Sequence, residues 1–265
     1  MGIQFDAEAA RRVEALYQTP DVAAQRRETL KSLDLRQGER VLDIGSGPGL
    51  LAHEMAANVG PEGQVRGIDT SEDMLAMSRK RCAEQPQAAF ESADATGLPY
   101  PDESFDAAVS TQVYEYVPDI PAALAELYRV LRPGGRAVIV DTDYDSLVMY
   151  TENPERMDRV LAAWDEHFVH GDLPRTLSPR LRDAGFTLRH RTVIPMFNPE
   201  YDSNTYSHGM IGIIASYVAG RNGVTREEAD AWAAEFAELG KQGKYFVSLN
   251  RYLFVADKPD ATGGA

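Results

Sequence analysis

The sequence predicts an α/β fold with a doubly wound, mainly parallel sheet of seven strands. Short apolar strands alternate with amphipathic helices between residues 41 and 141, and this alternation is typical of βαβ units. The segment Arg40–Leu51 (RVLDIGSGPGLL) places a glycine-rich turn directly after the first strand. A ligand can approach the main chain there because no Cβ intervenes. After about Asp145 the alternation stops, which favours a helical lid inserted in the C-terminal half.

Apolar periodicity and turn residues define the expected elements in order. Strands are expected at 41–44, 64–69, 88–92, 105–111, 136–141, 187–196 and 245–256. Helices are expected at 6–17, 21–33, 50–58, 71–84, 120–131, 154–168, 178–184, 210–219 and 225–239. Ser71 fits the N-cap of its helix, and Thr225 with Glu228 forms a capping box.

A chain of 265 residues is expected to form a single Rossmann-like domain. Its parts are N-terminal helices at 1–36, a ligand-binding core at 37–145, a lid region with the last strands at 146–257, and a disordered tail at 258–265. Right-handed crossovers between parallel strands leave the ligand site at the carboxyl ends of those strands.

Composition and charge narrow the possible partners and compartment. Lys and Arg number 27 and Asp and Glu number 41, a net charge of −14, which disfavours nucleic acid as a partner. No apolar run is long enough to span a membrane, and the first residues lack the apolar region of a secretory signal. Cys82 is the only cysteine, so no internal disulfide forms. These features lead us to expect a cytoplasmic protein.

The spacing of the glycine-rich turn indicates the class of cofactor. Asp43, Gly45, Gly47 and Gly49 form the pattern D-x-G-x-G-x-G, and Leu50 stands where a dinucleotide fingerprint needs its third glycine. The pattern resembles the first motif of class I S-adenosylmethionine (SAM)-dependent methyltransferases. Three further family motifs follow in order, namely Asp69 at the end of the second strand, the acidic Asp94, and the turn Leu131–Arg136 (LRPGGR). The resemblance is to small-molecule enzymes of the ubiquinone/menaquinone (methyltransferase type 11) group.

The resemblance implies SAM as the cofactor and assigns residues to it. A carboxylate at Asp69 can accept hydrogen bonds from vicinal ribose hydroxyls, which dinucleotides and SAM both offer. By resemblance, Asp94 receives the adenine amino group, while Tyr17 and either Arg26 or Arg27 close over the methionine end. An ordinary solvated helix face also explains Tyr17 and the two arginines. The full expected set is Tyr17, Arg26, Asp43, Gly45, Ser46, Gly47, Gly49, Asp69, Thr70, Met74, Ala93, Asp94, Ala95 and Gln112.

Methyl transfer from a sulfonium requires orientation, exclusion of water and removal of any acceptor proton. The acceptor pocket is expected over the fourth and fifth strands, where Gln112, Tyr114, Glu115, Tyr116, Asp141, Thr142, Asp143 and Tyr144 follow, with Tyr201, Tyr206 and His208 from the lid. His208 is the candidate base, with Tyr206 and Asp143 as further catalytic candidates. A histidine in a glycine-rich turn also fits a purely structural role.

No metal site is predicted. The run Asp141–Asp145 with Glu152 resembles an EF-hand loop, but Ser146 replaces the required glycine and a strand precedes the run. A magnesium-assisted O-methyltransferase stays open, because hard cations prefer carboxylates.

Two other functions known for this fold need residues that the sequence lacks. The segment 112–118 lacks the N/D-P-P-Y motif of nucleic-acid amino methyltransferases, and a single cysteine does not suit an arsenic methyltransferase. We therefore expect a small-molecule acceptor, aromatic or natural-product-like. A protein that binds SAM without transferring its methyl group is the alternative. O-, N- and C-methylation stay open, as does the oligomeric state.

Overall fold

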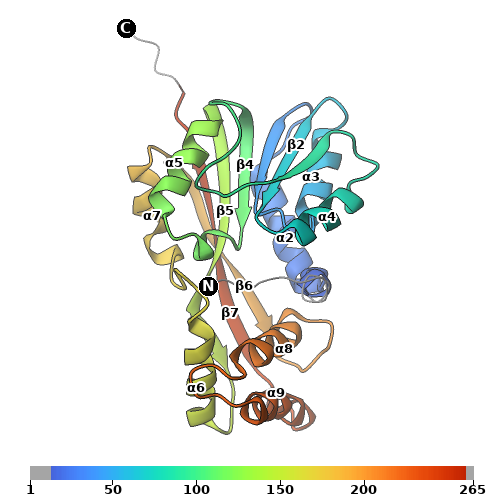
Figure 1. Cartoon of the computed structure of the whole chain (residues 1–265), viewed down its shortest axis with the longest axis vertical. Coiled ribbons are helices and arrows are strands. Elements are labelled where there is room, and N and C mark those ends of the chain that lie inside the picture. The colour runs from blue at the N-terminus through green and yellow to red at the C-terminus, as the bar shows by residue number, and fades with distance from the viewer. Residues whose placement is uncertain (1–12, 261–265) are drawn as a thin grey trace.

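A seven-stranded sheet organises the protein (Figure 1). The structure is a computed structural model that describes residues 13–260. The strand order is β3-β2-β1-β4-β5-β7-β6. The first five strands of this order pair in parallel, and β7 is antiparallel to both of its neighbours. The predicted doubly wound, mainly parallel α/β fold is confirmed.

The element bounds follow the chain order. The strands are β1 (Arg40–Ile44), β2 (Gln64–Asp69), β3 (Ala88–Ser92), β4 (Phe105–Thr111), β5 (Leu131–Met149), β6 (Thr187–Asn198) and β7 (Val247–Asp257). The helices are α2 (Pro20–Leu33), α3 (Leu50–Val59), α4 (Glu72–Arg81), α5 (Ile120–Val130), α6 (Pro154–Asp165), α7 (Pro174–Asp183), α8 (Tyr206–Val218) and α9 (Arg226–Lys241), with a 3₁₀ turn η1 (Tyr114–Tyr116).

Both faces of the parallel sheet are buried, which explains why β1 and β4 are almost continuously apolar. Val41 and Val109 belong to the core cluster that includes Met55 of α3. Leu42 and Ala108 point to the opposite face, as the alternation of a strand requires, and belong to the cluster that includes α5 and α7. Figure 1 shows α2, α3 and α4 on one side of the sheet and α5 and α7 on the other.

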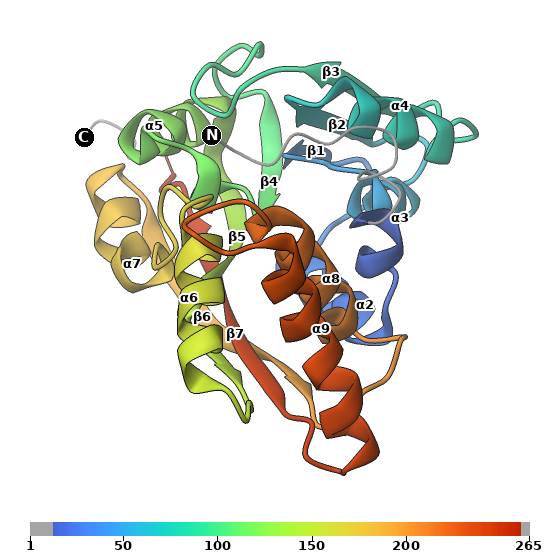
Figure 2. The ribbon, with the colours of Figure 1, turned by 60° about the horizontal axis from the view of Figure 1, so that its bottom comes forward.

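A second helical group covers the far ends of β5, β6 and β7. Helices α6, α8 and α9 contact one another there and surround these strands (Figure 2). The strand predicted at 136–141 was placed too short, because β5 continues to Met149. Its continuation is stabilised by antiparallel pairing of Val148 with Ser248 and of Met149 with Val247. The acidic run Asp141–Asp145 therefore lies within a strand and not in a calcium-type loop.

Two predicted helix starts were wrong. Helix α7 begins at Pro174, not at residue 178, with a proline in its first turn. Helix α8 begins at Tyr206, not at residue 210, and its first amides are satisfied from elsewhere in the chain. Asp21 Oδ2 accepts from the Tyr206 amide at 2.9 Å, and Asn198 Oδ1 accepts from the Ser207 amide at 3.1 Å.

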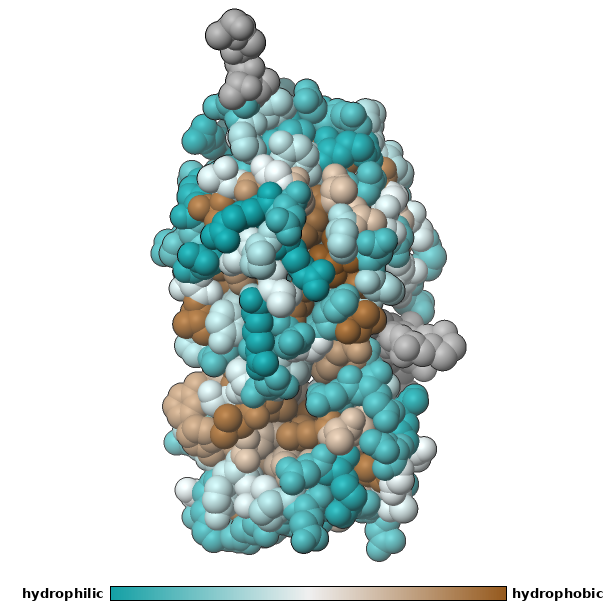
Figure 3. All heavy atoms as spheres, turned by 90° about the vertical axis from the view of Figure 1, so that its left-hand side faces the viewer, coloured by the Kyte–Doolittle hydropathy of each residue, from teal (hydrophilic) through white to brown (hydrophobic). Residues whose placement is uncertain are grey.

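Residues 1–12 and 261–265 lie outside the part of the chain that the structure describes. Of the helix predicted at 6–17, residues 13–17 are helical, and the rest lies outside the described residues, as do residues 261–265 of the predicted tail. Among residues 13–260, no helix is both long and apolar enough to cross a bilayer. Figure 3 shows mostly hydrophilic side chains on one face, interrupted by an apolar band at the level of α6.

Candidate active site

The turn between β1 and α3 has a backbone that requires glycine. Gly45 has φ +71°, and a Cβ there would lie 2.2 Å from Cγ2 of Val113. Gly47 has φ +52°, and no heavy atom lies within 4 Å of the position of its missing Cβ. Packing therefore excludes a side chain at Gly45, whereas Gly47 leaves open space beside the main chain for a ligand.

Asp69, at the end of β2, holds this turn in place. Its Oδ2 accepts a hydrogen bond from the Gly47 amide at 2.9 Å, and its Oδ1 accepts from the Ser71 amide at 2.9 Å. Burial raises the pKa of Asp69, and the amides of Ser71, Gly47 and Thr70 oppose that rise. Each carboxylate oxygen can accept a second bond, so Asp69 can fix the turn and still receive ribose hydroxyls.

Three buried polar atoms beside this turn lack partners within residues 13–260. They are Asp43 Oδ2, Ser46 Oγ and Thr111 Oγ1, and all three residues line the same cavity. Burial and the charge of Asp69 raise the pKa of Asp43 to about 7. Buried polar atoms normally have hydrogen-bond partners, so these atoms fit a site completed by a polar ligand such as SAM.

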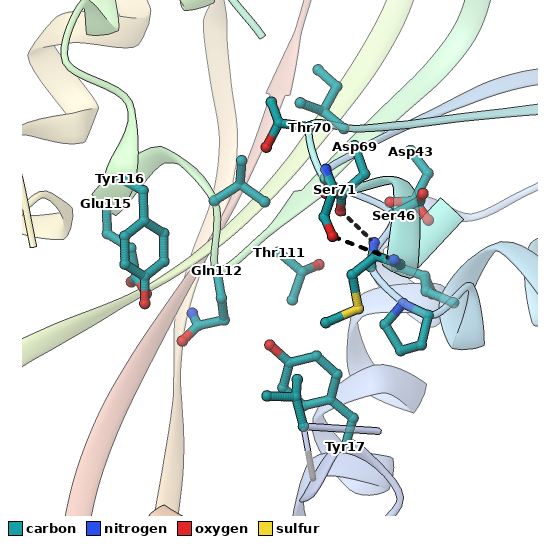
Figure 4. A pocket seen from close by; sticks show the side chains of 18 of the residues that line it. Tyr17, Asp43, Ser46, Asp69, Thr70, Ser71, Thr111, Gln112, Glu115 and Tyr116 are labelled. Carbon is teal, nitrogen blue, oxygen red and sulfur yellow. Dashed lines mark hydrogen bonds between the residues drawn. The ribbon is translucent and has the colours of Figure 1, made fainter. Parts of the chain in front are cut away.

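The cavity measures about 1130 Å³ and extends from the glycine-rich turn to α8 and β7. Figure 4 shows its two ends, with Asp69 and Asp43 at one, Glu115 and Tyr116 at the other, and Gln112 between them. The predicted residues that line it are Tyr17, Arg26, Asp43, Gly45, Ser46, Gly47, Asp69, Thr70, Met74, Ala93, Asp94, Ala95, Gln112, Glu115, Tyr116, Tyr144 and Tyr206.

Seven of the predicted cofactor and acceptor residues are not among the lining residues, namely Gly49, Tyr114, Asp141, Thr142, Asp143, Tyr201 and His208. Gly49 occupies the N-cap position of α3. Asp143 is paired with Arg175, whose Nε and Nη2 donate to its two carboxylate oxygens at 2.8 and 2.9 Å. His208 lies in α8, not in the predicted turn, with its ring 5.1 Å from that of Tyr201 between centroids. The structure therefore does not bring Asp143 or His208 to the reacting end of the cavity.

The N-terminal segment closes one wall of the cavity. Arg26 donates from Nη1 to the Tyr17 carbonyl oxygen at 2.9 Å and from Nε to Glu54 Oε1 at 2.7 Å. Burial raises the pKa of Tyr17 to about 12, so its phenol is neutral. The Tyr17 hydroxyl points toward the middle of the cavity (Figure 4).

Gln112 follows β4 in a left-handed conformation with φ +58°, which is uncommon for a residue other than glycine. Its amide donates to the Val140 carbonyl oxygen at 2.8 Å, and the Thr142 hydroxyl donates to its side-chain oxygen. Such backbone conformations cluster at functional sites and persist because the surroundings hold them. Here the conformation of Gln112 directs the segment after β4 into the cavity.

Sequence reasoning missed several residues at the far end of the cavity, among them Gln25, Trp164 and Arg251. Arg251 comes from β7 and is 2% exposed. A single arginine in an otherwise mostly apolar closing strand was the available signal. Residues 13–260 contain no group of three or more His, Cys, Asp or Glu side chains placed to bind a metal ion.

Comparison with known proteins agrees with this geometry. Residues 42–139 match the family described as "Methyltransferase domain". An uncharacterised 37.1 kDa protein in transposon Tn4556 of Streptomyces fradiae is 39% identical over 172 residues, covering 63% of this chain and 48% of that protein. Demethylmenaquinone methyltransferase of Symbiobacterium thermophilum is 38% identical over 118 residues, covering 43% of this chain and 47% of that protein. The chain thus spans about half the length of the curated relatives it matches.

A solved structure extends the similarity to almost the whole fold. The chain resembles a putative methyltransferase from Bacillus halodurans with a TM-score of 0.65 and 20% identity, covering 89% of this chain and 99% of the other. At this identity the likeness concerns the fold. Residues 42–139 thus match a methyltransferase domain, and the α/β fold that surrounds them is the doubly wound, mainly parallel one that the sequence predicted.

Proposed function

We propose that the protein binds SAM at the glycine-rich turn and transfers its methyl group to a small-molecule acceptor held at the other end of the cavity. One observation carries this proposal. A single cavity joins the turn and Asp69 to a second compartment walled by aromatic side chains. When bound, SAM supplies an electrophilic methyl group on a sulfonium. The chain itself must orient both molecules and exclude water.

The proposed cofactor contacts use the hydrogen-bonding atoms that have no partner within the described residues, or that can accept a further bond. Asp69 and Gly47 would meet the ribose side, and the unpartnered oxygens of Asp43 and Ser46 would accept or donate at the methionine end. Asp94 accepts both bonds from Thr96 with Oδ1, which keeps its other oxygen for the adenine amino group. The remaining proposed contacts are Tyr17, Arg26, Gly45, Thr70, Met74, Ala93, Ala95 and Gln112.

We further propose that the lid region, residues 146–257, together with the segment after β4, forms the acceptor side. Trp164, Tyr206 and Arg251 reach the cavity from that region. The name of one relative specifies demethylmenaquinone, so a naphthoquinol is a rational first acceptor. We place the reaction in the cytoplasm, in line with the single, unpaired Cys82.

Calorimetric titration with SAM, S-adenosylhomocysteine (SAH) and NAD tests the cofactor. We expect both sulfur ligands to bind and NAD not to bind. Asp69→Ala should lose that binding, because it removes the acceptor of the Gly47 amide as well as the ribose contact. Circular dichroism of the variant checks that it folds. Absence of SAM and SAH binding to the wild type would contradict the proposal.

Methyl transfer is tested separately from binding. SAM with a labelled methyl group is incubated with reduced 1,4-naphthoquinone and with a set of hydroxylated aromatic acceptors, and labelled product is measured. Transfer to any of them supports the proposed activity. Tight SAM binding without transfer to any acceptor would favour the alternative, a protein of this fold that binds SAM and does not methylate.

A further inference from the structure

A buried carboxylate and a buried guanidinium face the same end of the cavity. Glu115 comes from η1 directly after β4 and has no exposed surface, and Arg251 comes from β7 and is 2% exposed. Both line the cavity. Yet among the ion pairs of residues 13–260, none within 4.0 Å joins them. Opposite charges buried in one compartment without direct contact leave room for a polar group between them.

Each of the two side chains has unused hydrogen-bonding capacity. Glu115 accepts long bonds, from the Thr142 amide to Oε2 at 3.3 Å and from the Tyr144 hydroxyl to Oε1 at 3.4 Å. Arg251 donates from Nη1 to Gln25, and its guanidinium lies 4.5 Å from the ring centroid of Tyr206. Its Nε is buried and has no partner within residues 13–260. A guanidinium N–H group without a partner is an available donor for an anionic oxygen.

Aromatic side chains line the cavity that Glu115 and Arg251 share. The wall residues are Tyr17, Tyr116, Tyr144, Trp164 and Tyr206. The titratable groups that face Glu115 are Arg251 from β7, Asp141 and Tyr144 from β5, Tyr116 from η1, Tyr17 from the N-terminal segment and Tyr206 from α8. This arrangement suits a flat aromatic body with a polar group at one position.

The positive charges of Arg251 and of the donor sulfonium favour some flat aromatic acceptors over others. A protonated amine would meet the charge of Arg251 and the sulfonium of the donor in a site sheltered from water, where repulsion is strong. An oxyanion would be attracted by both. Burial raises the pKa of Glu115 to about 7, against the opposing effects of the Thr142 amide and Arg251. Such a carboxylate can accept a proton near neutral pH.

We propose that the acceptor is a hydroxylated aromatic or enol compound, that Glu115 takes its hydroxyl proton, and that Arg251 holds the resulting oxyanion. The inference rests on the proposed methyl transfer. The O–H bond breaks, its electron pair stays on the acceptor, and the proton goes to Glu115. The acceptor's oxygen or its conjugated carbon then forms the bond to the methyl carbon, while the carbon–sulfur bond breaks and its electrons remain on the sulfur of SAH.

The test uses 4-nitrophenolate as a probe and sinefungin as the donor analogue, at about pH 8, where Glu115 with a pKa of about 7 is ionised. Titration calorimetry in two buffers of different ionisation enthalpy gives the number of protons taken up on binding. We expect the wild type to bind the probe and to take up close to one proton, which Glu115 receives beside the bound anion. Benzylamine should not bind measurably.

Substitutions assign the two roles. Glu115→Gln imitates the protonated carboxyl, so it should bind the probe at least as tightly as the wild type but without proton uptake, and it should lack methyl transfer. Arg251→Met should weaken probe binding at least tenfold, and Arg251→Lys should recover part of it. Arg189→Met is the matched control, because Arg189 is exposed and pairs with Asp257 at the edge of the sheet. Sinefungin affinity verifies that each variant is folded.

Several results would overturn the inference. They are a wild type that binds sinefungin but not 4-nitrophenolate, binding of the probe without proton uptake, tight binding of benzylamine, or an Arg251→Met variant that binds the probe as well as the wild type does. If the wild type binds neither sinefungin nor SAH, the proposed function itself fails, and this inference fails with it.

Discussion

Arg26 donates a hydrogen bond to the backbone carbonyl oxygen of Tyr17, across nine residues and around the start of α2. The same guanidinium pairs with Glu54 of α3. Arg26 therefore ties the N-terminal segment to the helix that follows the glycine-rich turn. Arg26, which we propose as a cofactor contact, also holds Tyr17 in position over the cavity through this hydrogen bond.

Arg26→Ala is expected to weaken SAH binding about tenfold, because losing roughly 1.4 kcal/mol of positioning energy corresponds to that factor. Titration calorimetry measures the change. Arg27→Ala is the matched control, since the neighbouring Arg27 is exposed, and it should change the affinity less than twofold. Equal effects of the two variants would show that Tyr17 does not need this hydrogen bond.

Gly47→Ala tests whether the cofactor approaches the open side of the turn. Gly47 and Gly38 both have positive φ, and neither has an atom within 4 Å of its missing Cβ. Alanine should therefore cost a similar 1–2 kcal/mol of stability at either position, measurable by urea unfolding. Gly47 lines the cavity and Gly38 does not. Of these two variants, only Gly47→Ala should therefore also weaken SAH binding, by about tenfold or more. Unchanged binding in Gly47→Ala would place the ligand elsewhere.

The features that the sequence predicted correctly are encoded over short stretches. Strand β1, the glycine-rich turn and α3 occupy residues 40–59 without interruption, and each requires particular residue types locally. Asp69 was predicted because it ends the next strand along the sheet, and parallel strands bring their carboxyl ends together. Asp43, Asp69 and Gln112 line the cavity for this reason, because they lie at or directly after the carboxyl ends of β1, β2 and β4.

The features that were missed depend on distant partners. Helix α8 starts early because Asp21 and Asn198 cap it, and no local pattern shows that. Arg251 reaches the cavity because β7 inserts between β5 and β6, and periodicity along one strand does not tell which neighbour it will have. His208 was predicted as the base because an imidazole is suited to proton removal near neutral pH. The early start of α8 instead places His208 within that helix.

Asp43 is expected to make stability depend on pH. Burial and Asp69 raise its pKa from 3.8 to about 7 in the folded protein, so the folded state retains a proton that the unfolded chain releases. Stability should therefore fall as pH rises from about 4 to about 7. Asp43→Asn removes this loss and should be more stable than the wild type by about 2–4 kcal/mol at pH 8, with little difference at pH 4.

Urea unfolding of both proteins at the two pH values measures the Asp43 effect. Asp158→Asn, at an exposed position, serves as the control and should change the stability by less than about 0.5 kcal/mol at both pH values. Glu115 and Asp141 also have raised pKa values because of burial, but they are unchanged in the comparison. A stability difference that is the same at both pH values would show that Asp43 ionises normally in the folded protein.

The buried pair of Glu39 and Arg136 is expected to contribute to the loss of stability at acid pH. Arg136 donates from Nη1 and Nη2 to Glu39 at 2.9 and 2.7 Å, and its guanidinium also binds the carbonyl oxygens of Leu33 and Asp34 at the end of α2. Although burial opposes ionisation, hydrogen bonds from Arg136 and the Arg36 amide lower the pKa of Glu39. Its contribution is therefore present at neutral pH and is lost as pH falls through that lowered value.

Glu39→Gln should cost about 3 kcal/mol or more at pH 7, because it leaves the buried Arg136 without its counter-charge. The cost should shrink at acid pH, as the pH falls through the lowered pKa of Glu39 and the wild-type carboxyl becomes protonated as well. Glu238→Gln breaks an exposed pair with Lys241 and should cost less than about 1 kcal/mol at either pH. If urea unfolding shows equal losses for the two variants, the end of α2 is held by the carbonyl contacts of Arg136 alone, and its charge pairing with Glu39 adds nothing.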